Sequence, residues 1–172
     1  FKMSGGVITG NTASRNGGGV AVAKGTFTMS GDARVTGNNA FRESNSNFKT
    51  FNGGGVYVGA NGVFTMNDSA SVDTNETKCC NAEILSRGGG VYVYNSTFNM
   101  TDGEITGNTA YYGGGVGLTS DAVFHMDGGT IRANSLNNQY SVNGGGVWVD
   151  NGCSFIVSGT VIPRFSATFS FT

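Results

Sequence analysis

The feature that most constrains this chain is a glycine triplet followed by valine that occurs five times. Each copy lies within the same longer pattern, so the chain has to be interpreted first as a repeat. The shortest complete unit runs from Gly88 to Tyr112 and is 25 residues long. A residue that would stand alone in an ordinary domain is therefore one member of a column. The repeats begin near residues 1, 17, 53, 88, 113 and 144.

Three short blocks recur in a fixed order within the repeat. They are Gly-Gly-Gly-Val-x-Val, then Phe-x-Met, then Ile or Val followed after two residues by Asn. Alternation with period two indicates strands, and no apolar period of 3.6 indicates helices. Hairpins in a sandwich would not require the same order every time. The sequence predicts an all-β, right-handed parallel β-helix of about six coils with three short strands per coil.

The repeated positions also predict the interior of each coil. Phe, Met, Val and Ile columns stack at about 4.8 Å, and each buried side chain contributes roughly 1.5–3 kcal/mol. Glycine permits positive φ and close backbone approach at the corners. The asparagine of the third block tolerates the left-handed conformation and can hydrogen-bond to its counterpart in the next coil. The predicted structural ladder consists of Asn11, Asn38, Asn75, Asn108 and Asn134.

The pattern sets the predicted domain boundaries. The β-helix repeat covers residues 1–160, and residues 161–172 form a strand-like tail or cap after Pro163 ends the ladder of donors. Such a tail can cover the last coil or add to the sheet of a neighbouring chain. The chain opens inside a repeat at Phe1, so we expect it to be a processed piece or a fragment of a larger protein.

Composition excludes several classes of partner. The net charge of −1 provides no electrostatic footprint for nucleic acid. No apolar run approaches the roughly 20 residues that span a bilayer, so direct membrane insertion is not predicted. The cysteines Cys79, Cys80 and Cys153 match neither a zinc spacing nor a disulfide framework.

Length variation is concentrated at one corner, between the ladder asparagine and the next glycine triplet. The long segments there are Asn39–Asn52, Glu76–Arg87 and Ser135–Asn143. Insertions at one corner project from one edge of a solenoid, where loops carry binding functions in repeat proteins. They hold exposed aromatic candidates for contact with a partner or a glycan: Phe41, Phe48 and Tyr140. This edge is the main functional candidate.

An outward row of aromatic residues is the second candidate for partner or glycan binding. Tyr57, Tyr92 and Trp148 occupy the same outward position of the first block, and Gly117 interrupts them. Aromatic faces suit sugar rings and partner hot spots. The alternative is that the inserted loops fold over this row and bury it, since its strand starts where the loops end.

Catalytic, metal and cofactor sites are not predicted. A polysaccharide-cleaving β-helix needs paired carboxylates, or acids that bind Ca²⁺ beside a basic residue, on one outward face. No two carboxylates align at the outward strand positions, and His125, the single histidine, has no partner at its level. The glycine-rich Ca²⁺-binding nonapeptide with its fixed aspartate is also missing.

The repeats resemble a known group of bacterial proteins. Gly-Gly-Gly-Val, Phe-x-Met-Ser-Gly-Gly and Ile-Thr-Gly-Asn-Thr-Ala are similar to the repeats of polymorphic outer-membrane-protein-like surface proteins, whose passenger regions resemble pectate-lyase-type β-helices. The chain departs from them in its third glycine, where they have alanine, and in Ile or Val where they have Phe before x-x-Asn. The resemblance implies a secreted, surface-displayed, often adhesive bacterial β-helix, and it carries over no catalytic residue.

These observations lead to one expectation and two alternatives. We expect a non-enzymatic, extracellular or cell-surface, adhesin-like module that presents variable loops along one edge to a host protein or glycan. The first alternative is a structural subunit that assembles into a filament or sheath end to end or through the C-terminal strand. The second is a polysaccharide-active β-helix enzyme.

Overall fold

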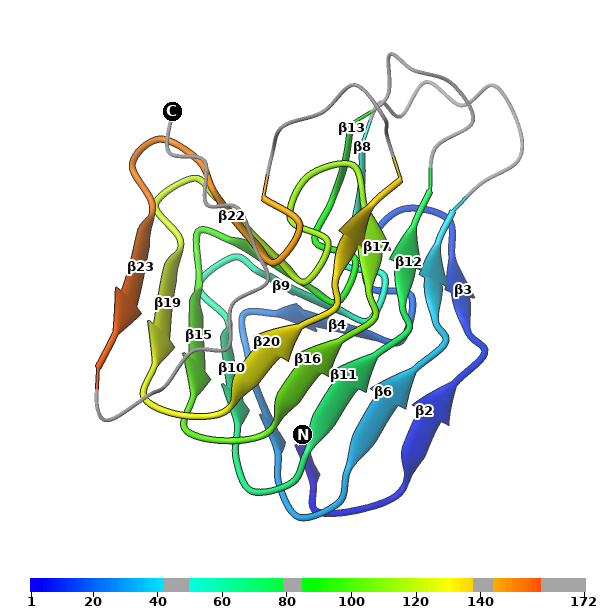
Figure 1. The fold of residues 1–172 in the computed structure, drawn as a ribbon, viewed down its shortest axis with the longest axis vertical. Coiled ribbons are helices and arrows are strands. Elements are labelled where there is room, and N and C mark those ends of the chain that lie inside the picture. The colour runs from blue at the N-terminus through cyan, green and yellow to red at the C-terminus, as the bar shows by residue number, and fades with distance from the viewer. Residues whose placement is uncertain (42–49, 79–84, 138–143, 159–172) are drawn as a thin grey trace.

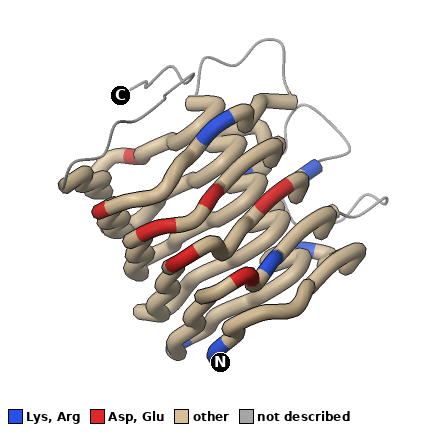
Figure 2. The backbone as a smooth tube through the Cα atoms, turned by 60° about the horizontal axis from the view of Figure 1, so that its bottom comes forward, with Lys and Arg blue, Asp and Glu red and all other residues tan. Residues whose placement is uncertain are grey.

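The computed structural model describes residues 1–41, 50–78, 85–137 and 144–158, and within them every regular element is a β-strand. Successive repeats stack as coils of a parallel β-helix, with the N-terminal coil at one end of the stack (Figures 1 and 2). All strand pairs between coils are parallel, and equivalent residues of the repeats pair in register. The predicted solenoid is confirmed. The predicted tail, residues 161–172, lies outside the described residues.

Two sheets follow directly from the first two blocks. The strands after the glycine triplets form the five-stranded Gly sheet: β4 (Val20–Ala23), β9 (Val56–Gly59), β14 (Val91–Tyr94), β18 (Val116–Thr119) and β22 (Val147–Val149). The Phe-x-Met blocks form the six-stranded Phe sheet: β1 (Lys2–Met3), β5 (Thr26–Met29), β10 (Val63–Met66), β15 (Thr97–Met100), β19 (Val123–Met126) and β23 (Ser154–Val157).

Two further sheets follow from the third block. The Ile sheet contains β2 (Val7–Thr9), β6 (Arg34–Thr36), β11 (Ser71–Asp73), β16 (Glu104–Thr106) and β20 (Thr130–Arg132). After the ladder asparagine comes a two-residue strand that the sequence did not predict, and these strands form the short sheet: β3 (Thr12–Ala13), β7 (Asn39–Ala40), β12 (Glu76–Thr77), β17 (Thr109–Ala110) and β21 (Ser135–Leu136). Two residues are too few to show an alternating pattern.

The first two glycines of the triplet meet different requirements. The first glycine adopts a left-handed conformation, with φ of +62° at Gly88. The second lies against neighbouring backbone, because a Cβ at Gly89 would collide with the carbonyl oxygens of Thr109 and Gly114. The corner therefore needs both the conformational freedom and the small size of glycine.

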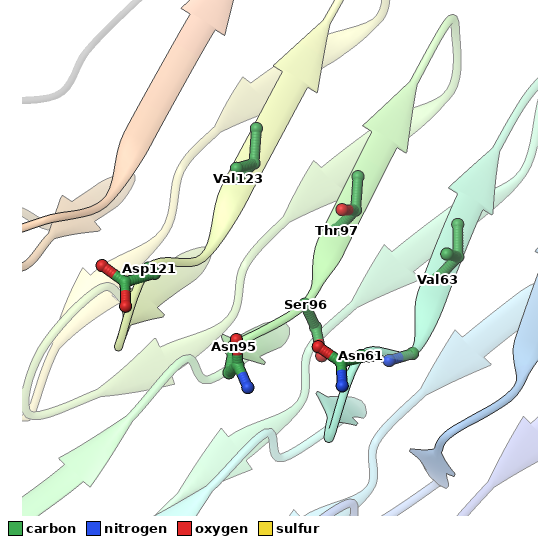
Figure 3. A pocket seen from close by; sticks show the side chains of 8 residues that line it. Asn61, Val63, Asn95, Ser96, Thr97, Asp121 and Val123 are labelled. Atoms are coloured by element: carbon green, nitrogen blue, oxygen red, sulfur yellow. Dashed lines mark hydrogen bonds between the residues drawn. The ribbon is translucent and has the colours of Figure 1, made fainter.

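The turns between the Gly sheet and the Phe sheet have two lengths. In the second and fourth coils they contain two residues, 24–25 and 95–96. In the third and fifth coils they contain three, 60–62 and 120–122. The turn at 95–96 is therefore flanked on both sides by longer turns, and these turns lie beside the start of the Phe sheet (Figure 3).

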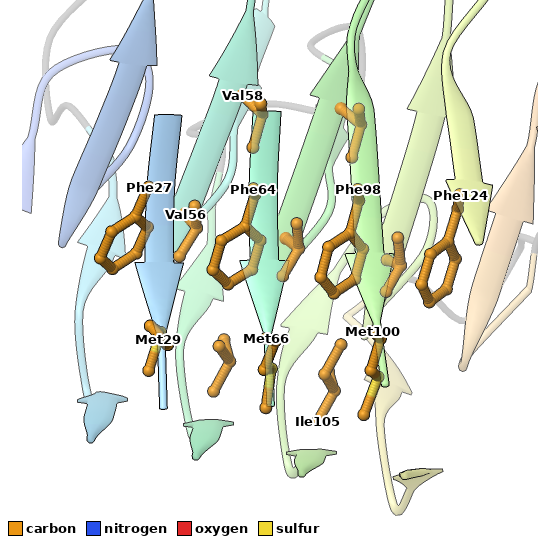
Figure 4. Packing of buried hydrophobic residues seen from close by; sticks show 14 of the residues in the cluster. Phe27, Met29, Val56, Val58, Phe64, Met66, Phe98, Met100, Ile105 and Phe124 are labelled. Carbon is orange, nitrogen blue, oxygen red and sulfur yellow. The ribbon is translucent and has the colours of Figure 1, made fainter. Parts of the chain in front are cut away.

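The core is a set of columns, one residue per coil (Figure 4). Consecutive phenylalanine rings are stacked, with centroids 5.1 Å apart from Phe27 to Phe64, 4.8 Å from Phe64 to Phe98, and 4.4 Å from Phe98 to Phe124. Met66 and Met100 are fully buried beside them. Offset-stacked rings stabilise one another beyond their area burial. Each coil is therefore stabilised by stacking on the phenylalanine at the same position of the adjacent coils.

Candidate functional site

The predicted asparagine ladder is present as a chain of side-chain hydrogen bonds between coils. The Nδ2 of Asn75 donates to the Oδ1 of Asn108 at 3.0 Å, and Asn108 donates to Asn134 in the same way. The Oδ1 atoms of four ladder residues also accept a backbone N–H: Asn38, Asn75, Asn108 and Asn134. The second Nδ2 hydrogen of Asn108 goes to the carbonyl oxygen of Val72. The amides of the buried members Asn38, Asn75 and Asn108 are therefore engaged within the stack.

Unequal segments leave and rejoin the stack at one edge. They leave from the short sheet, where Ala40 pairs with Thr77 and Ala110 pairs with Leu136. Two of them return through a parallel pair, β8 (Thr50–Asn52) and β13 (Leu85–Arg87), in which Thr50 pairs with Leu85. The fourth coil closes the same corner directly through Tyr111 and Tyr112. The insertions of the second, third and fifth coils therefore start from one sheet, and the short link of the fourth coil interrupts their series.

The three aromatic candidates from these insertions differ in what the structure says of them. Phe41 is half-buried and its N–H donates to the carbonyl oxygen of Ala13 at 2.9 Å. Phe48 and Tyr140 lie outside the described residues, as do Cys79 and Cys80. The contact of Phe41, Phe48 and Tyr140 with a partner stays a prediction.

The outward aromatic row exists in register, but most of it is buried. Tyr57 pairs with Tyr92, Tyr92 with Gly117, and Gly117 with Trp148. Tyr92 is 4% exposed and Trp148 is 7% exposed, whereas Tyr57 is half-buried. Tyr92 and Trp148 are therefore covered and do not offer a flat aromatic surface to a ligand.

The described residues that cover this row come from the corner itself. The Arg87 guanidinium lies over the rings of Tyr112 and Trp148, 6.0 and 5.7 Å from their centroids, and these two rings are 5.0 Å apart. The Tyr92 hydroxyl is 2.6 Å from the Thr119 hydroxyl. Burial raises the pKa of Tyr92. Arg87 and Tyr112 each stand directly before a glycine triplet, and the two residues pair between coils. The residue type at this position changes from repeat to repeat, so the pattern did not predict their contact with Trp148.

One aromatic residue of the Gly sheet remains exposed. Tyr94 is 43% exposed at the end of β14, next to the two-residue turn at 95–96. It pairs with Gly59 and Thr119, small neighbours that leave its ring uncovered.

The carboxylates on the outer face of the Ile sheet are engaged in ion pairs. Asp73 Oδ1 lies 3.0 Å from Arg34 Nη2, and Glu104 pairs with Arg132. Burial alone would raise the pKa of Asp73, but hydrogen bonds from Thr36, Ser71 and Arg34 and the charge of Arg34 outweigh it, so the pKa is lowered. A carboxylate held ionised in this way is a poor general acid.

The described residues contain no group of three or more His, Cys, Asp or Glu side chains placed to share a metal ion. Cys153 is a half-buried free thiol whose pKa is raised by burial. Among the same residues there is no helix with the length and hydrophobicity needed to cross a membrane.

Comparisons of the chain with protein-family models, with curated proteins and with solved structures found no match.

Proposed function

We propose that this chain is a non-enzymatic, extracellular or cell-surface binding module of the adhesin type, in which the β-helix holds variable segments along one edge. The observation that carries the proposal is the alignment of their departure and return points. Strand ends that pair in register, such as Ala40 with Thr77 and Thr50 with Leu85, fix the ends of successive insertions side by side. Rigid scaffolds that position variable loops are a common basis for binding.

The distribution of polar chemistry supports binding over hydrolysis. On the outer face of the Ile sheet, Asp73 and Glu104 are each neutralised by an arginine. Retaining and inverting glycosidases need one carboxyl group that can give up a proton and a second that can act as base or nucleophile. The bacterial origin and the surface location of the proposed module rest on the repeat resemblance.

The proposal is tested by shortening the insertions while keeping the scaffold. Residues 39–52 and 76–87 are each replaced by the four-residue link Thr109–Tyr112, which closes the same corner in the fourth coil. Fluorescently labelled wild-type chain is applied to arrays of glycans and extracellular-matrix proteins. We expect binding to at least one array component, and its loss in the shortened variant with unchanged β-type circular dichroism.

The control asks about catalysis directly. The wild-type chain is incubated with acidic and neutral polysaccharides, and new reducing ends and unsaturated products are measured. Release of either product would contradict the non-enzymatic part of the proposal. Array binding that survives the shortening of both insertions would contradict the role of the edge.

A further inference from the structure

A pocket of about 200 Å³ lies where the two-residue turn of the fourth coil is flanked by the longer turns of the third and fifth coils (Figure 3). We call it the short-turn pocket. The third coil contributes Asn61, Gly62 and Val63, the fourth contributes Asn95, Ser96 and Thr97, and the fifth contributes Asp121 and Val123. The hollow is thus a direct consequence of one missing residue in one turn.

The walls of this pocket combine polar groups with apolar surface. Asn61 and Asn95 each supply an amide donor and acceptor, whereas the Asp121 carboxylate points away from Ser96, toward Gly152 of the sixth coil (Figure 3). The Ser96 side chain is the buried member, since the residue is 6% exposed. Its oxygen accepts the N–H of Gly62 at 3.2 Å, and within the described part of the chain no acceptor is recorded for its proton. Val63 and Val123 provide apolar surface beside them.

The polar groups are held in place by the coil stack. The backbone of Asn61, Asn95 and Asp121 is left-handed, with φ of 65°, 43° and 58°. Asn61 N donates to Asn95 O at 2.9 Å, and Asn95 N donates to Thr119 O at 3.2 Å. Because each turn is hydrogen-bonded to the next, little ordering is needed when a ligand binds, and preorganisation of this kind favours affinity.

The chemistry of the walls selects the class of ligand. Among the described lining residues, the one carboxylate points away from the hollow and no side chain is cationic. The pocket therefore suits neither Ca²⁺, which usually collects 6–8 oxygen ligands in a protein, nor an anion. Amide and hydroxyl groups beside valine side chains suit a ring with hydroxyls at its rim and C–H groups on its face. We propose that the short-turn pocket binds one neutral pyranose residue of a glycan.

The surroundings of the pocket fit a ligand longer than one ring. Val63, Thr97 and Val123 begin the outer face of the Phe sheet, whose next outward row contains Thr65, Asn99 and His125 in register. These side chains are half-buried and mostly polar. The adjoining sugar of a glycan chain would lie across this row. The inference rests on the proposed binding function and assigns it a glycan site away from the insertion edge.

Nuclear magnetic resonance tests the site with defined probes. The ¹⁵N-labelled chain is titrated separately with methyl α-D-mannopyranoside, methyl β-D-glucopyranoside and methyl β-D-galactopyranoside, and then with CaCl₂. We expect saturable amide shifts confined to Asn61, Asn95, Ser96, Asp121 and their neighbours with at least one glycoside. No saturable shift with any glycoside, or shifts with CaCl₂ alone, would overturn the proposal.

Two variants, each with one added glycine, test whether binding depends on the shape of the pocket. A glycine inserted between Asn95 and Ser96 gives this turn the length of its neighbours and fills the hollow. We expect about tenfold or greater weakening of glycoside binding, which corresponds to about 1.4 kcal/mol. The control is the same insertion between Lys24 and Gly25, in the other two-residue turn, and it leaves binding unchanged. Equal affinities of the two variants would contradict the assignment.

A substitution tests the pocket without changing its backbone. Asn95→Gly keeps a residue that tolerates the left-handed conformation and removes only the amide side chain. We expect several-fold weaker glycoside binding with unchanged thermal stability, and undiminished binding would count against the proposal. The two proposals fail separately when the full-length and shortened chains compared on the arrays both carry the glycine insertion after Asn95. The edge is then tested without the short-turn pocket, and the pocket is tested by glycoside shifts.

Discussion

Phe98 and Asn99 are neighbours on β15, and their side chains point to opposite faces of the Phe sheet. Inward, Phe98 stacks on Phe64 and Phe124, and the same residue occupies this position in consecutive coils. Outward, the equivalents of Asn99 are Thr65 and His125. An interior side chain must fill the space left by two copies of itself, whereas an outer one meets solvent on one side. The interior position therefore keeps the same residue type in consecutive coils, whereas the residue type at the outer position varies.

The largest expected effect comes from opening the interior column. Phe98→Ala removes a ring that contacts two others and should lower the free energy of unfolding by about 3–5 kcal/mol. Urea titration followed by circular dichroism measures it. Asn99→Ala, one residue away on the outer face, should change stability by less than about 0.5 kcal/mol. Similar losses for the two variants would remove the distinction between the faces.

The next effect concerns the polar interior. Asn108→Ala deprives Asn75 of acceptors for its N–H and for its Nδ2. Since a buried unsatisfied donor costs about 1–3 kcal/mol, we expect a loss of about 2–4 kcal/mol in the same urea titration. Asn11→Ala, at the exposed end of the ladder, serves as the matched control and should lose less than about 1 kcal/mol. A larger loss at Asn11 would show that the ladder is not stabilised by burial.

A smaller effect is expected for the ion pair of the Ile sheet whose carboxylate is the more buried, Asp73 with Arg34. The Asp73 side chain is 9% exposed and accepts hydrogen bonds from Arg34, Thr36 and Ser71. Asp73→Asn should cost about 1.5–3 kcal/mol at neutral pH, the range for hydrogen bonds to a charged group.

The pH dependence of this difference follows from the lowered pKa of Asp73. The folded value lies below the unfolded value of about 3.9. The ionised carboxylate therefore stabilises the fold above about pH 4, and this contribution is lost as the pH falls through the folded pKa. Urea titrations of the wild type and Asp73→Asn between pH 7 and pH 2 should converge on acidification. A gap that widens toward low pH would contradict this reasoning.

The smallest effect is expected at the second ion pair. Glu104 and Arg132 have reversed positions relative to Asp73 and Arg34, and the Glu104 side chain is 34% exposed. Glu104→Gln should cost about 0.2–1 kcal/mol, as exposed ion pairs do, and the cost should shrink in 1 M NaCl. Melting temperatures with and without salt measure it. A loss as large as that of Asp73→Asn would mean that burial does not separate the two pairs.

Much of the candidate site could not be read from the sequence, for reasons visible in particular residues. The outward phase of Tyr92 and Trp148 was predictable, because a strand alternates with period two. The burial of Trp148 was not, because it involves Arg87 and Tyr112, which lie against its ring from the glycine corner of other coils. The short-turn pocket was also out of reach, since a turn one residue shorter becomes a hollow only when its neighbours in the stack are known.

The sequence alone determined what repeats: the parallel coils, the phase of each strand, the stacked phenylalanines, the glycine corner and the asparagine ladder. It could do so because a column requires a similar residue in every coil, and the same short blocks therefore recur in the same order along the chain. The tertiary structure decided what does not repeat. The partners of Asp73 and Glu104, the cover over Trp148 and the hollow beside Ser96 arise between different side chains of adjacent coils, which only the folded stack brings together.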